Sequence, residues 1–453
     1  MKYRIESDAL GEIKVPQGAL YGAQTQRAVD NFKISGLHFH DHFIKALALI
    51  KKNAALVNLE LKLIDKQVSE LIVAAADEVI EGKHDEQFVV DVFQTGSGTS
   101  TNMNMNEVIA GRANEIHSGK RGIKKPVHPN DHVNQCQSSN DVIPSAINIS
   151  VLMLIESNLE PALENLLDSL AKKAEEFTDI KKLGRTHLQD AVIMTLGQEF
   201  SGYASQVSKN IKMLGDAKKY LYDLSLGGTA VGTGINAHPE FAAKVISAIS
   251  GQTGIKFNEA GNHFASQASQ DSSVAVSGAL NTIAVSLTKI ANDIRWLSSG
   301  PRAGLGEINL PALQPGSSIM PGKVNPVIPE AVLQVAAQIT GNDATITAAA
   351  KGGNFELNTM LPVIAYNLLQ SVEIMANASV VFAEKCIDGI TANKVKCRSN
   401  VDNSLDIAVK LIPYIGYDKA SEIAKIAYRE GKTVRQVVEE QNILTTGQLK
   451  EVF

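Results

Sequence analysis

The segment GSSIMPGKVNP at residues 316–326 has the composition of a reactive loop, because two hydroxyls, a lysine and an asparagine stand between glycines and prolines. Glycine gives such a loop mobility, so it can present a nucleophile or a base beside a positive charge. Ser317 alone is a poor base, and it would need Lys323 and backbone amides to stabilise its oxyanion. A flexible surface loop with incidental serines is the alternative interpretation.

Four further polar segments are dense in small neutral hydrogen-bond donors. They span residues 94–106, 127–141, 183–190 and 226–234. Hydroxyl and amide groups of this kind could surround carboxylates and keep a dicarboxylate oriented. The candidates, with one residue of the loop, are Ser97, Thr99, Ser138, Ser139, Asn140, Thr186 and Asn325. Helix capping and turn formation are the alternative roles of these residue types.

Other kinds of site fit the same segments less well. The sequence has no GxxxxGK[ST] motif, and GGTAVGTG at 227–234 lacks the preceding strand and the acidic ribose ligand of a dinucleotide site. His38, His40 and His42 lack cysteine or carboxylate partners at known spacing, so they are expected in a surface loop rather than around a metal. His187, in GRTHLQD, is either a structural or a catalytic histidine.

The elements that must position these residues are mainly helical. Apolar residues at steps of three and four run from Leu280 to Leu297, and a second such seam runs from Leu152 to Leu170. Pro161 lies inside the second seam and predicts a kink, because its ring removes one backbone hydrogen bond. Helical patterning also covers 191–224, 329–350 and 360–385. Five long helical segments favour a bundle.

No period-two alternation is long enough for a sheet of many strands, so a mainly α fold is expected. With 453 residues, about three domains are expected. We predict an N-terminal domain over 1–137, a central helical domain over 138–390 and a small C-terminal domain over 391–453.

Composition limits the partners and the compartment. A net charge of −5 gives no overall basic field, so neither nucleic acid nor an anionic membrane is an expected partner. Three cysteines without zinc-ligand spacing suit a reducing compartment. The N-terminal residues lack the apolar core of a signal peptide, and no span has eighteen uninterrupted apolar residues. A cytoplasmic location is therefore expected.

Taken together, the polar segments are more specific than any one of them. GSSIMPGKVNP closely resembles the signature of the fumarase/aspartase superfamily, and the resemblance extends from GAQTQRA at 22–28 to IGYDKA at 415–420. The resemblance implies a cofactor-free lyase with three domains and a central five-helix bundle. It also implies a homotetramer with a twenty-helix core, in which each active site draws residues from three subunits.

Within the superfamily, the active-site segments resemble class II fumarases. These segments are QTGSGTSTNMNMNE, QSSND and LGGTAVGTGINAHPEF. Other stretches, EINLPALQPGSS, VNPVIPE and CIDGITANK, resemble aspartases. The expected reaction is the reversible anti-addition of water to fumarate, giving (S)-malate, and aspartate ammonia-lyase is the alternative. A non-catalytic protein on the same scaffold is a further alternative, although the reactive residues are all present.

The resemblance assigns roles position by position. Ser317 matches the catalytic base, while Lys323 and Asn325 match ligands of a substrate carboxylate. Further substrate contacts match Thr99, Ser138, Ser139, Asn140, Thr186 and His187, with Ser97 at the edge of the pocket. Glu330 matches the acid that orients the histidine. A second anion site matches His128, Asn130 and Asp131, near which Lys125 replaces an arginine and so lacks its planar fork.

Overall fold

The computed structural model describes residues 2–453 and confirms a mainly α fold. Strands in this part of the chain form only two-stranded pairs. The helices are α1 Ala23–Asn31, α2 Asp41–Glu60, α3 Lys66–Ile80, α4 Thr99–Ser118, α5 Ser139–Leu154, α6 Glu160–Glu176, α7 Leu196–Ala217, α8 Phe241–Thr253, α9 His263–Ala268, α10 Asp271–Leu297, α11 Val327–Ala350, α12 Leu361–Lys385, α13 Lys394–Asn403, α14 Ile412–Ile415, α15 Tyr417–Glu430, α16 Val434–Glu440 and α17 Thr446–Val452. The strands are β1 Tyr3–Asp8, β2 Gly11–Pro16, β3 Lys181–Thr186, β4 Gln189–Thr195, β5 Asp223–Leu224, β6 Asn258–Glu259, β7 Ile308–Asn309, β8 Gly353–Asn354, β9 Leu357–Asn358 and β10 Thr391–Ala392.

The chain divides into two compact units, each built from separate stretches of sequence. The first holds the residues up to Pro161 together with Ile211–Ala284 and Val335–Asn377. The second holds Ala162–Asn210, Val285–Gln334 and Ala378–Phe453. The domain boundaries near 137 and 390 stay predictions.

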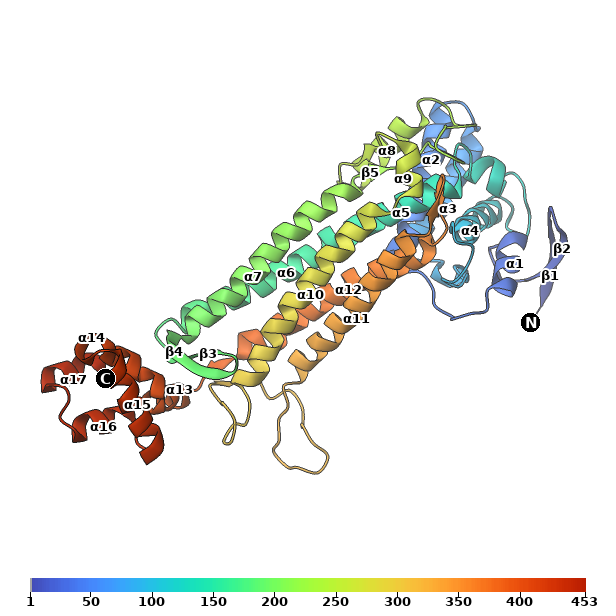
Figure 1. The fold of residues 1–453 in the computed structure, drawn as a ribbon. Helices are drawn as coiled ribbons and strands as arrows, with labels where there is room; N and C mark the ends of the chain where they lie inside the picture. The colour runs from blue at the N-terminus through green and yellow to red at the C-terminus, as the bar shows by residue number, and fades with distance from the viewer. Residues whose placement is uncertain (1) are drawn as a thin grey trace. The chain divides into compact units, whose positions relative to one another are not determined.

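The first unit packs α2, α3, α4 and α5 around one another, with the β1–β2 hairpin beside α1 (Figure 1). Helix α2 is apolar on most of its surface and is buried accordingly, from Phe43 to Asn58. Polar contacts join the long helices in this unit: Ser277 on α10 donates to Asp343 on α11 at 2.6 Å. These contacts fix helix register within an otherwise apolar core.

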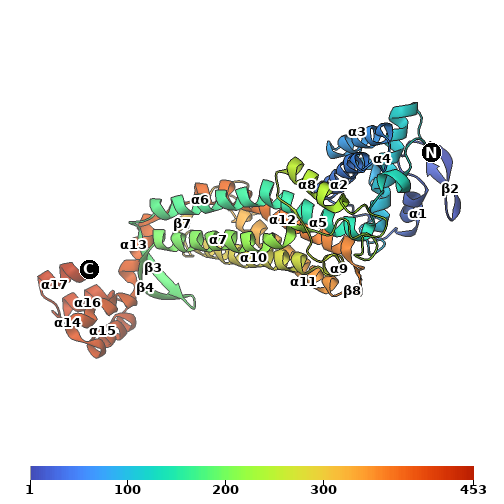
Figure 2. The same ribbon diagram turned by 90° about the horizontal axis from the view of Figure 1, so that it is seen from above.

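In the second unit, α6, the first part of α7 and the last part of α10 lie side by side (Figure 2). The seam predicted toward Leu297 is buried there, since Ile290, Ile294 and Leu297 are at most 4% exposed. Tyr203 on α7 donates to Asp293 on α10 at 3.1 Å.

The kink predicted at Pro161 has a specific form. A π-helical turn over Ile155–Leu159 separates α5 from α6, directly before the proline. Because proline lacks a backbone N–H, a carbonyl one turn earlier loses its ordinary donor, and a wider turn absorbs the defect. The two helices thus continue one another through a local irregularity.

The helix predicted over 191–224 is wrong at both ends. Residues up to Thr195 belong to β4, which pairs antiparallel with β3, and α7 starts only at Leu196. The reason lies in the turn between the strands, where His187 and Leu188 have φ angles of 56° and 59°. Two consecutive positive φ angles match the hairpin turn whose twist suits paired strands. At its other end, α7 gives way to a 3₁₀ turn after Ala217.

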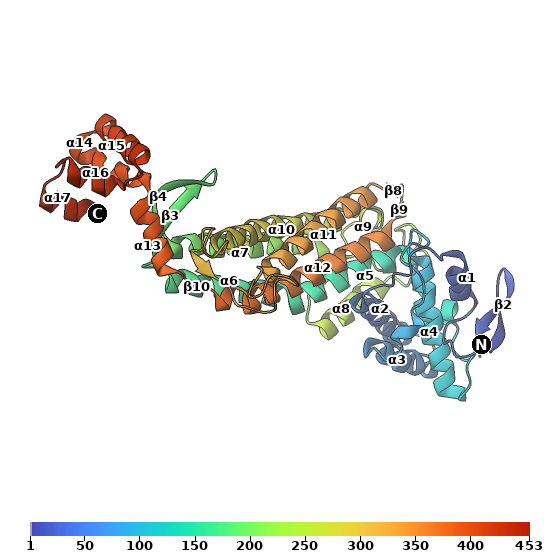
Figure 3. The same cartoon turned by 90° about the horizontal axis from the view of Figure 1, so that it is seen from below.

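The C-terminal residues from 405 onward pack around their own apolar cluster, visible as the α14–α17 group in Figure 3. Leu411, Ala427, Val434 and Val438 are fully buried in it. Two other helical stretches, Ser139–Glu176 and Asp271–Leu297, are long and apolar enough to cross a membrane, but 78% and 50% of their most apolar windows are buried inside the protein.

Candidate active site

The starts of α4 and α5 bring the first group of candidate residues together. Thr99, the first residue of α4, and Ser139, the first residue of α5, join their hydroxyls at 2.6 Å. Ser97 adds a third hydroxyl 2.8 Å from that of Thr99. The two helix N-termini present positive dipole ends at the same place, which suits a negatively charged group.

Ser138 and Asp141 form a capping box at the start of α5. The Ser138 hydroxyl accepts from the Asn140 N–H at 3.2 Å, and the Asp141 carboxylate accepts from the Ser138 N–H at 2.9 Å. Ser138 therefore does cap a helix, which was the alternative interpretation of this residue. A capping role also fixes where Ser139 and Asn140 point, because it holds the first turn of the helix.

Asp141 extends this order to the glycine-rich segment 226–234. Its second oxygen accepts from the N–H groups of Gly227 and Thr229, at 3.0 and 2.9 Å. Burial raises the pKa of the Asp141 carboxyl to about 6, against these backbone donors and the charge of Lys51. These backbone N–H groups are therefore bonded to a carboxylate of the same chain and are not free to bind a phosphate. Beside them, Asn140 donates to the Ala230 carbonyl at 2.8 Å.

The second group of candidates belongs to the second unit. Thr186 ends β3 and His187 occupies the hairpin turn, with both side chains exposed. Arg185, which directly precedes Thr186, forms two hydrogen bonds with Glu307, at 3.0 and 2.8 Å. Glu307 is fully buried and also accepts from Asn400 at 3.0 Å. The hairpin that carries Thr186 and His187 is therefore anchored by a buried ion pair.

Glu307 lies at the root of the segment that leads into the Ser317 loop. Burial acts to raise the pKa of Glu307, but the hydrogen bond from Arg185, the charge of Lys182 and the Asn400 amide together hold it below its ordinary value. Its backbone N–H donates to the Leu297 carbonyl at 2.8 Å. One buried residue, Glu307, therefore links the hairpin through its carboxylate and the end of α10 through its backbone N–H, at the start of the loop segment.

The Ser317 loop closes on itself. Backbone N–H groups of Ile319 and Met320 donate to the Ser317 hydroxyl oxygen at 3.2 and 3.0 Å. The loop is pinned where the Gly316 N–H donates to the Lys323 carbonyl at 2.8 Å. A Cβ at Gly316 would lie 2.5 Å from that carbonyl oxygen, so the close approach requires glycine.

The other predicted loop residues divide between structural and open positions. Asn325 is half-buried and donates to the Gly316 carbonyl at 2.6 Å, while Lys323 is exposed. Glu330 stands in the first turn of α11. Within the described chain no hydrogen bond or ion pair joins Glu330 to His187, so the orienting role of Glu330 stays a prediction.

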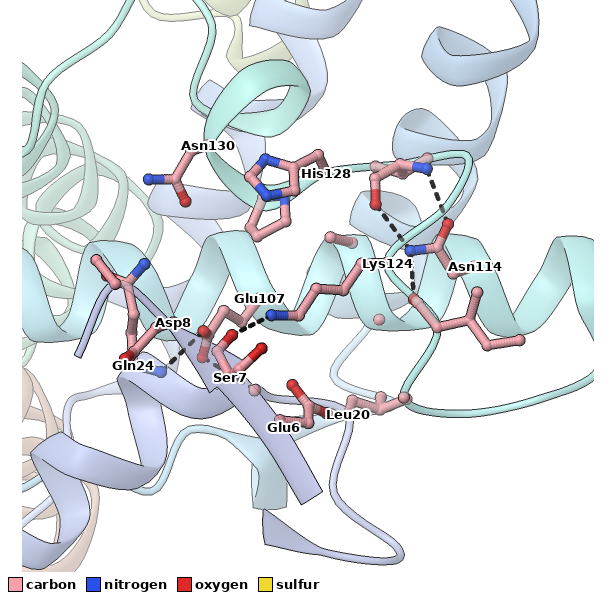
Figure 4. Close-up of a pocket in the computed structure, with 18 residues that line it drawn as sticks. Glu6, Ser7, Asp8, Leu20, Gln24, Glu107, Asn114, Lys124, His128 and Asn130 are labelled. Carbon is pink, nitrogen blue, oxygen red and sulfur yellow. Dashed lines mark hydrogen bonds between the residues drawn. The ribbon is translucent and has the colours of Figure 1, made fainter. Parts of the chain in front are cut away.

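The residues of the predicted second anion site lie around a π-helical turn, Pro129–Val133. His128 accepts from the Asp131 N–H at 3.2 Å, and its ring nitrogen lies 3.2 Å from the Asp131 carboxylate. His128 and Asn130 line a pocket of ≈ 260 Å³, and Figure 4 shows them on one side of it with Glu6 and Gln24 opposite. Asp131 is not part of the lining.

This pocket has mixed charge. Glu107 faces it but is occupied, since its carboxylate accepts from the N–H groups of Gly22, Gln24 and Thr25 at the start of α1. Lys124 also faces it and donates to the Ser7 carbonyl (Figure 4). None of the hydroxyls around Thr99 lines this pocket, so it is separate from the cluster at the starts of α4 and α5.

The candidates thus fall into two sets, each placed within its own unit. The first unit holds Ser97, Thr99, Ser138, Ser139, Asn140, His128, Asn130 and Asp131; the second holds Thr186, His187, Ser317, Lys323, Asn325 and Glu330. Sequence reasoning missed Asp141, although the S-x-x-D spacing of a capping box was present at 138–141. It also missed Glu307 and Lys51, for which no local signal exists.

Of the three histidines at 38–42, one caps a helix. His40 is the N-cap of α2 and accepts from the His42 N–H at 3.1 Å, so the expected surface loop is wrong for His42. His40 also pairs with Glu373 at 3.2 Å. In residues 2–453 no group of three or more His, Cys, Asp or Glu side chains is arranged to hold a metal ion.

Two family models match this chain. One, described as "Lyase", matches residues 11–341, and the other, described as "Fumarase C C-terminus", matches residues 407–453. Curated relatives include class II fumarate hydratases of Halobacterium salinarum, 54% identical over 100% of this chain and 96% of that protein, and of Nitrosomonas europaea, 52% identical over 96% and 94%.

Solved structures agree with the sequence relatives. The crystal structure of a class II fumarase from Schistosoma mansoni is similar with a TM-score of 0.96 and 40% identity, over 100% of this chain and 98% of that one. The matches to the Halobacterium and Schistosoma proteins both cover the whole length of this chain and therefore extend over both units. The chain therefore belongs to the class II fumarate hydratase family.

Proposed function

We propose that this protein catalyses the reversible anti-addition of water to fumarate, giving (S)-malate. The observation that carries the proposal is the full-length identity to class II fumarate hydratases of about half of all positions. The local geometry supports it, because the Thr99–Ser139 hydroxyl cluster lies between two helix N-termini, where a carboxylate would be stabilised. These relatives favour hydration over the ammonia-lyase alternative.

The difficult step is removal of the malate C3 proton. That proton becomes acidic only as the neighbouring carboxylate accepts the electron pair and becomes an aci-carboxylate with additional negative charge. In the proposed mechanism, Lys323 and Asn325 bind this carboxylate, and the hydroxyl cluster binds the other one. Donors fixed before the reaction stabilise the developing charge without reorganising, which is where electrostatic catalysis contributes most.

Ser317 is the proposed base. The N–H groups of Ile319 and Met320 already donate to its oxygen, and the same two donors would stabilise an alkoxide at that atom. The alkoxide takes the C3 proton, and the C–H electron pair moves into the neighbouring carboxylate. That pair then returns to form the C2–C3 double bond as the C2–O bond breaks, and the hydroxyl departs from the opposite face. That hydroxyl needs a proton, which a water held by His187, Ser139 and Asn140 would supply, with Glu330 orienting His187.

We further propose that four copies assemble and that each active site is completed by neighbouring chains. In a single chain the proposed catalytic segments are open: Ile319 is 84% exposed and Leu188, next to His187, is 69% exposed. Apolar side chains beside catalytic groups would be covered in an assembly, and covering them would exclude water from the reaction. A cytoplasmic location is proposed as well, since Cys136, Cys386 and Cys397 are buried free thiols.

The test is a direct assay of the purified chain with malate and, separately, with aspartate, following the ultraviolet absorbance of fumarate. We expect a fumarate signal with malate and none with aspartate. A signal with aspartate alone would overturn the hydratase proposal in favour of an ammonia-lyase. The His187→Asn variant should lose most of the malate signal, because the water that protonates the leaving hydroxyl loses its ligand.

A further inference from the structure

Lys51 is a buried cation that the proposed mechanism does not use. Its side chain, in the middle of α2, is 0% exposed. The ammonium donates to the side-chain oxygens of Asn102 at 2.8 Å, Gln137 at 2.9 Å and Asn134 at 3.1 Å. Three acceptors use all three N–H groups of a protonated lysine, and none of them is a carboxylate.

The partners of Lys51 belong to the two segments that carry the hydroxyl cluster. Asn102 is one helical turn after Thr99 in α4, on the same face. Gln137 directly precedes Ser138, the N-cap of α5. Asn134 joins the two, since it accepts from the Asn102 amide at 3.1 Å and donates to the Gln137 carbonyl at 3.1 Å. One ammonium thus connects the start of α4 to the start of α5.

Burying an ammonium is costly unless its contacts compensate. Burial lowers the pKa of Lys51 to about 7, although the negative charge of Asp141 acts in the opposite direction. An apolar side chain would fill the same space in the core without this cost. The side chain therefore has a use that packing alone does not explain.

We propose that Lys51 is a positioning residue for substrate binding, which ties the first turn of α4 to the 134–137 segment so that Thr99, Ser138 and Ser139 keep a shared orientation. The inference rests on the proposed function, because these hydroxyls are its substrate contacts. The 2.6 Å contact between Thr99 and Ser139 lies directly beyond the tie. Without the hydrogen bonds from Lys51, the N-termini of α4 and α5 can move apart.

The test compares Lys51→Met with a matched control, Lys52→Met. Lys52 is the next residue of α2 and loses the same charge, but it pairs with Asp77 on α3 at 2.7 Å, away from the cluster. With malate as substrate, Lys51→Met should raise KM about tenfold or more and change kcat less, because substrate contacts act on ground and transition states alike. Lys52→Met should keep both constants within about twofold.

A second variant separates positioning from stability. Lys51→Gln is uncharged but can still donate to neighbouring oxygens, so its KM should lie between those of the wild type and Lys51→Met. A purely structural role would lower the melting temperature of both variants and leave KM of the folded protein unchanged, which would overturn the inference. If neither variant folds, Gln137→Ala decides, since it keeps the charge and removes one contact: a raised KM supports the tie, and an unchanged KM overturns it.

The activity of the wild-type protein separates a failure of the proposed function from a failure of the role of Lys51. A wild-type chain without activity on malate would refute the proposed function itself. An active wild type together with Lys51→Met at wild-type KM would refute only the role of Lys51.

Discussion

Replacing Glu307 by glutamine tests whether its buried ion pair with Arg185, next to the His187 hairpin, stabilises the folded protein. The substitution keeps the side-chain volume and removes one negative charge. Arg185, which is 15% exposed in its side chain, would lose one of its two acceptors, and Lys182, at 3.6 Å from the carboxylate, would keep only Glu199. Lys182 would then keep one carboxylate, that of Glu199, and Arg185 would keep only its longer contact with the exposed Asp190, at 3.8 Å.

The magnitude follows from burial. Removing one partner of a buried ion pair costs about 3–5 kcal/mol, because the other charge stays in a poorly solvated place. Glutamine can still accept one hydrogen bond, so we expect the free energy of unfolding to fall by about 3 kcal/mol. Glu115 is the matched control: it also pairs with two arginines, Arg112 and Arg121, but its side chain is 19% exposed, against 0% for Glu307. Glu115→Gln should cost less than about 1 kcal/mol.

The assay is urea denaturation followed by circular dichroism, at one protein concentration because assembly makes the midpoint concentration-dependent. The pKa of Glu307 is below its ordinary value in the folded protein, so its contribution is present above the unfolded pKa and is lost as pH falls through the folded one. The difference between wild type and Glu307→Gln should therefore shrink in acid. Equal midpoints for Glu307→Gln and Glu115→Gln at neutral pH would refute this reasoning.

Three other predictions follow from the same structure. Ser317→Ala should abolish turnover while dicarboxylate binding survives in calorimetry, whereas Ser318→Ala, one residue along the same loop, should stay active; near-full turnover of Ser317→Ala would remove that residue from its role. Gly316→Ala should reduce kcat/KM about tenfold or more with little change in melting temperature, because a Cβ there would clash with the Lys323 carbonyl oxygen. Unchanged kinetics would show that the active conformation of the loop does not need this close approach. The hydrogen bond from Arg112 lowers the pKa of Glu78 to about 2, so acid titration of stability should show a loss below pH 4.5 that is smaller in Glu78→Gln; identical titrations would contradict the pairing.

Much of the scaffold could be predicted because its signals are local. The predicted 329–350 and 360–385 correspond to α11 and α12 within two residues at each end, since the apolar period of a long helix is strong. Pro161 marked an irregularity that the structure places just before it. Strand β4 was not predicted, because its apolar residues run directly into α7 and its partner strand lies across a turn of unusual φ.

One contact among the candidate residues was predictable, because residue type carries the information there, while the roles of these residues stay predictions. Hydroxyls at Thr99 and Ser139 were identified as a set and lie in contact, although 40 residues separate them. Lys51 and Glu307 were not identified because their partners, Asn102 and Arg185, are 51 and 122 residues away, and a lysine or glutamate in a helix or loop is ordinarily solvated. Only the fold makes their charges buried and therefore consequential.

The central claim is that hydroxyls at the start of α5 and the serine of the 316–326 loop serve one pocket built from neighbouring chains. We expect Ser139→Ala and Ser317→Ala each to be inactive alone, and mixing them under conditions that exchange subunits tests the claim directly. If each site takes these residues from different chains, mixed tetramers contain some intact sites, and activity should return to at most about one quarter of wild type. Mixtures that stay inactive after demonstrated subunit exchange would contradict the shared pocket.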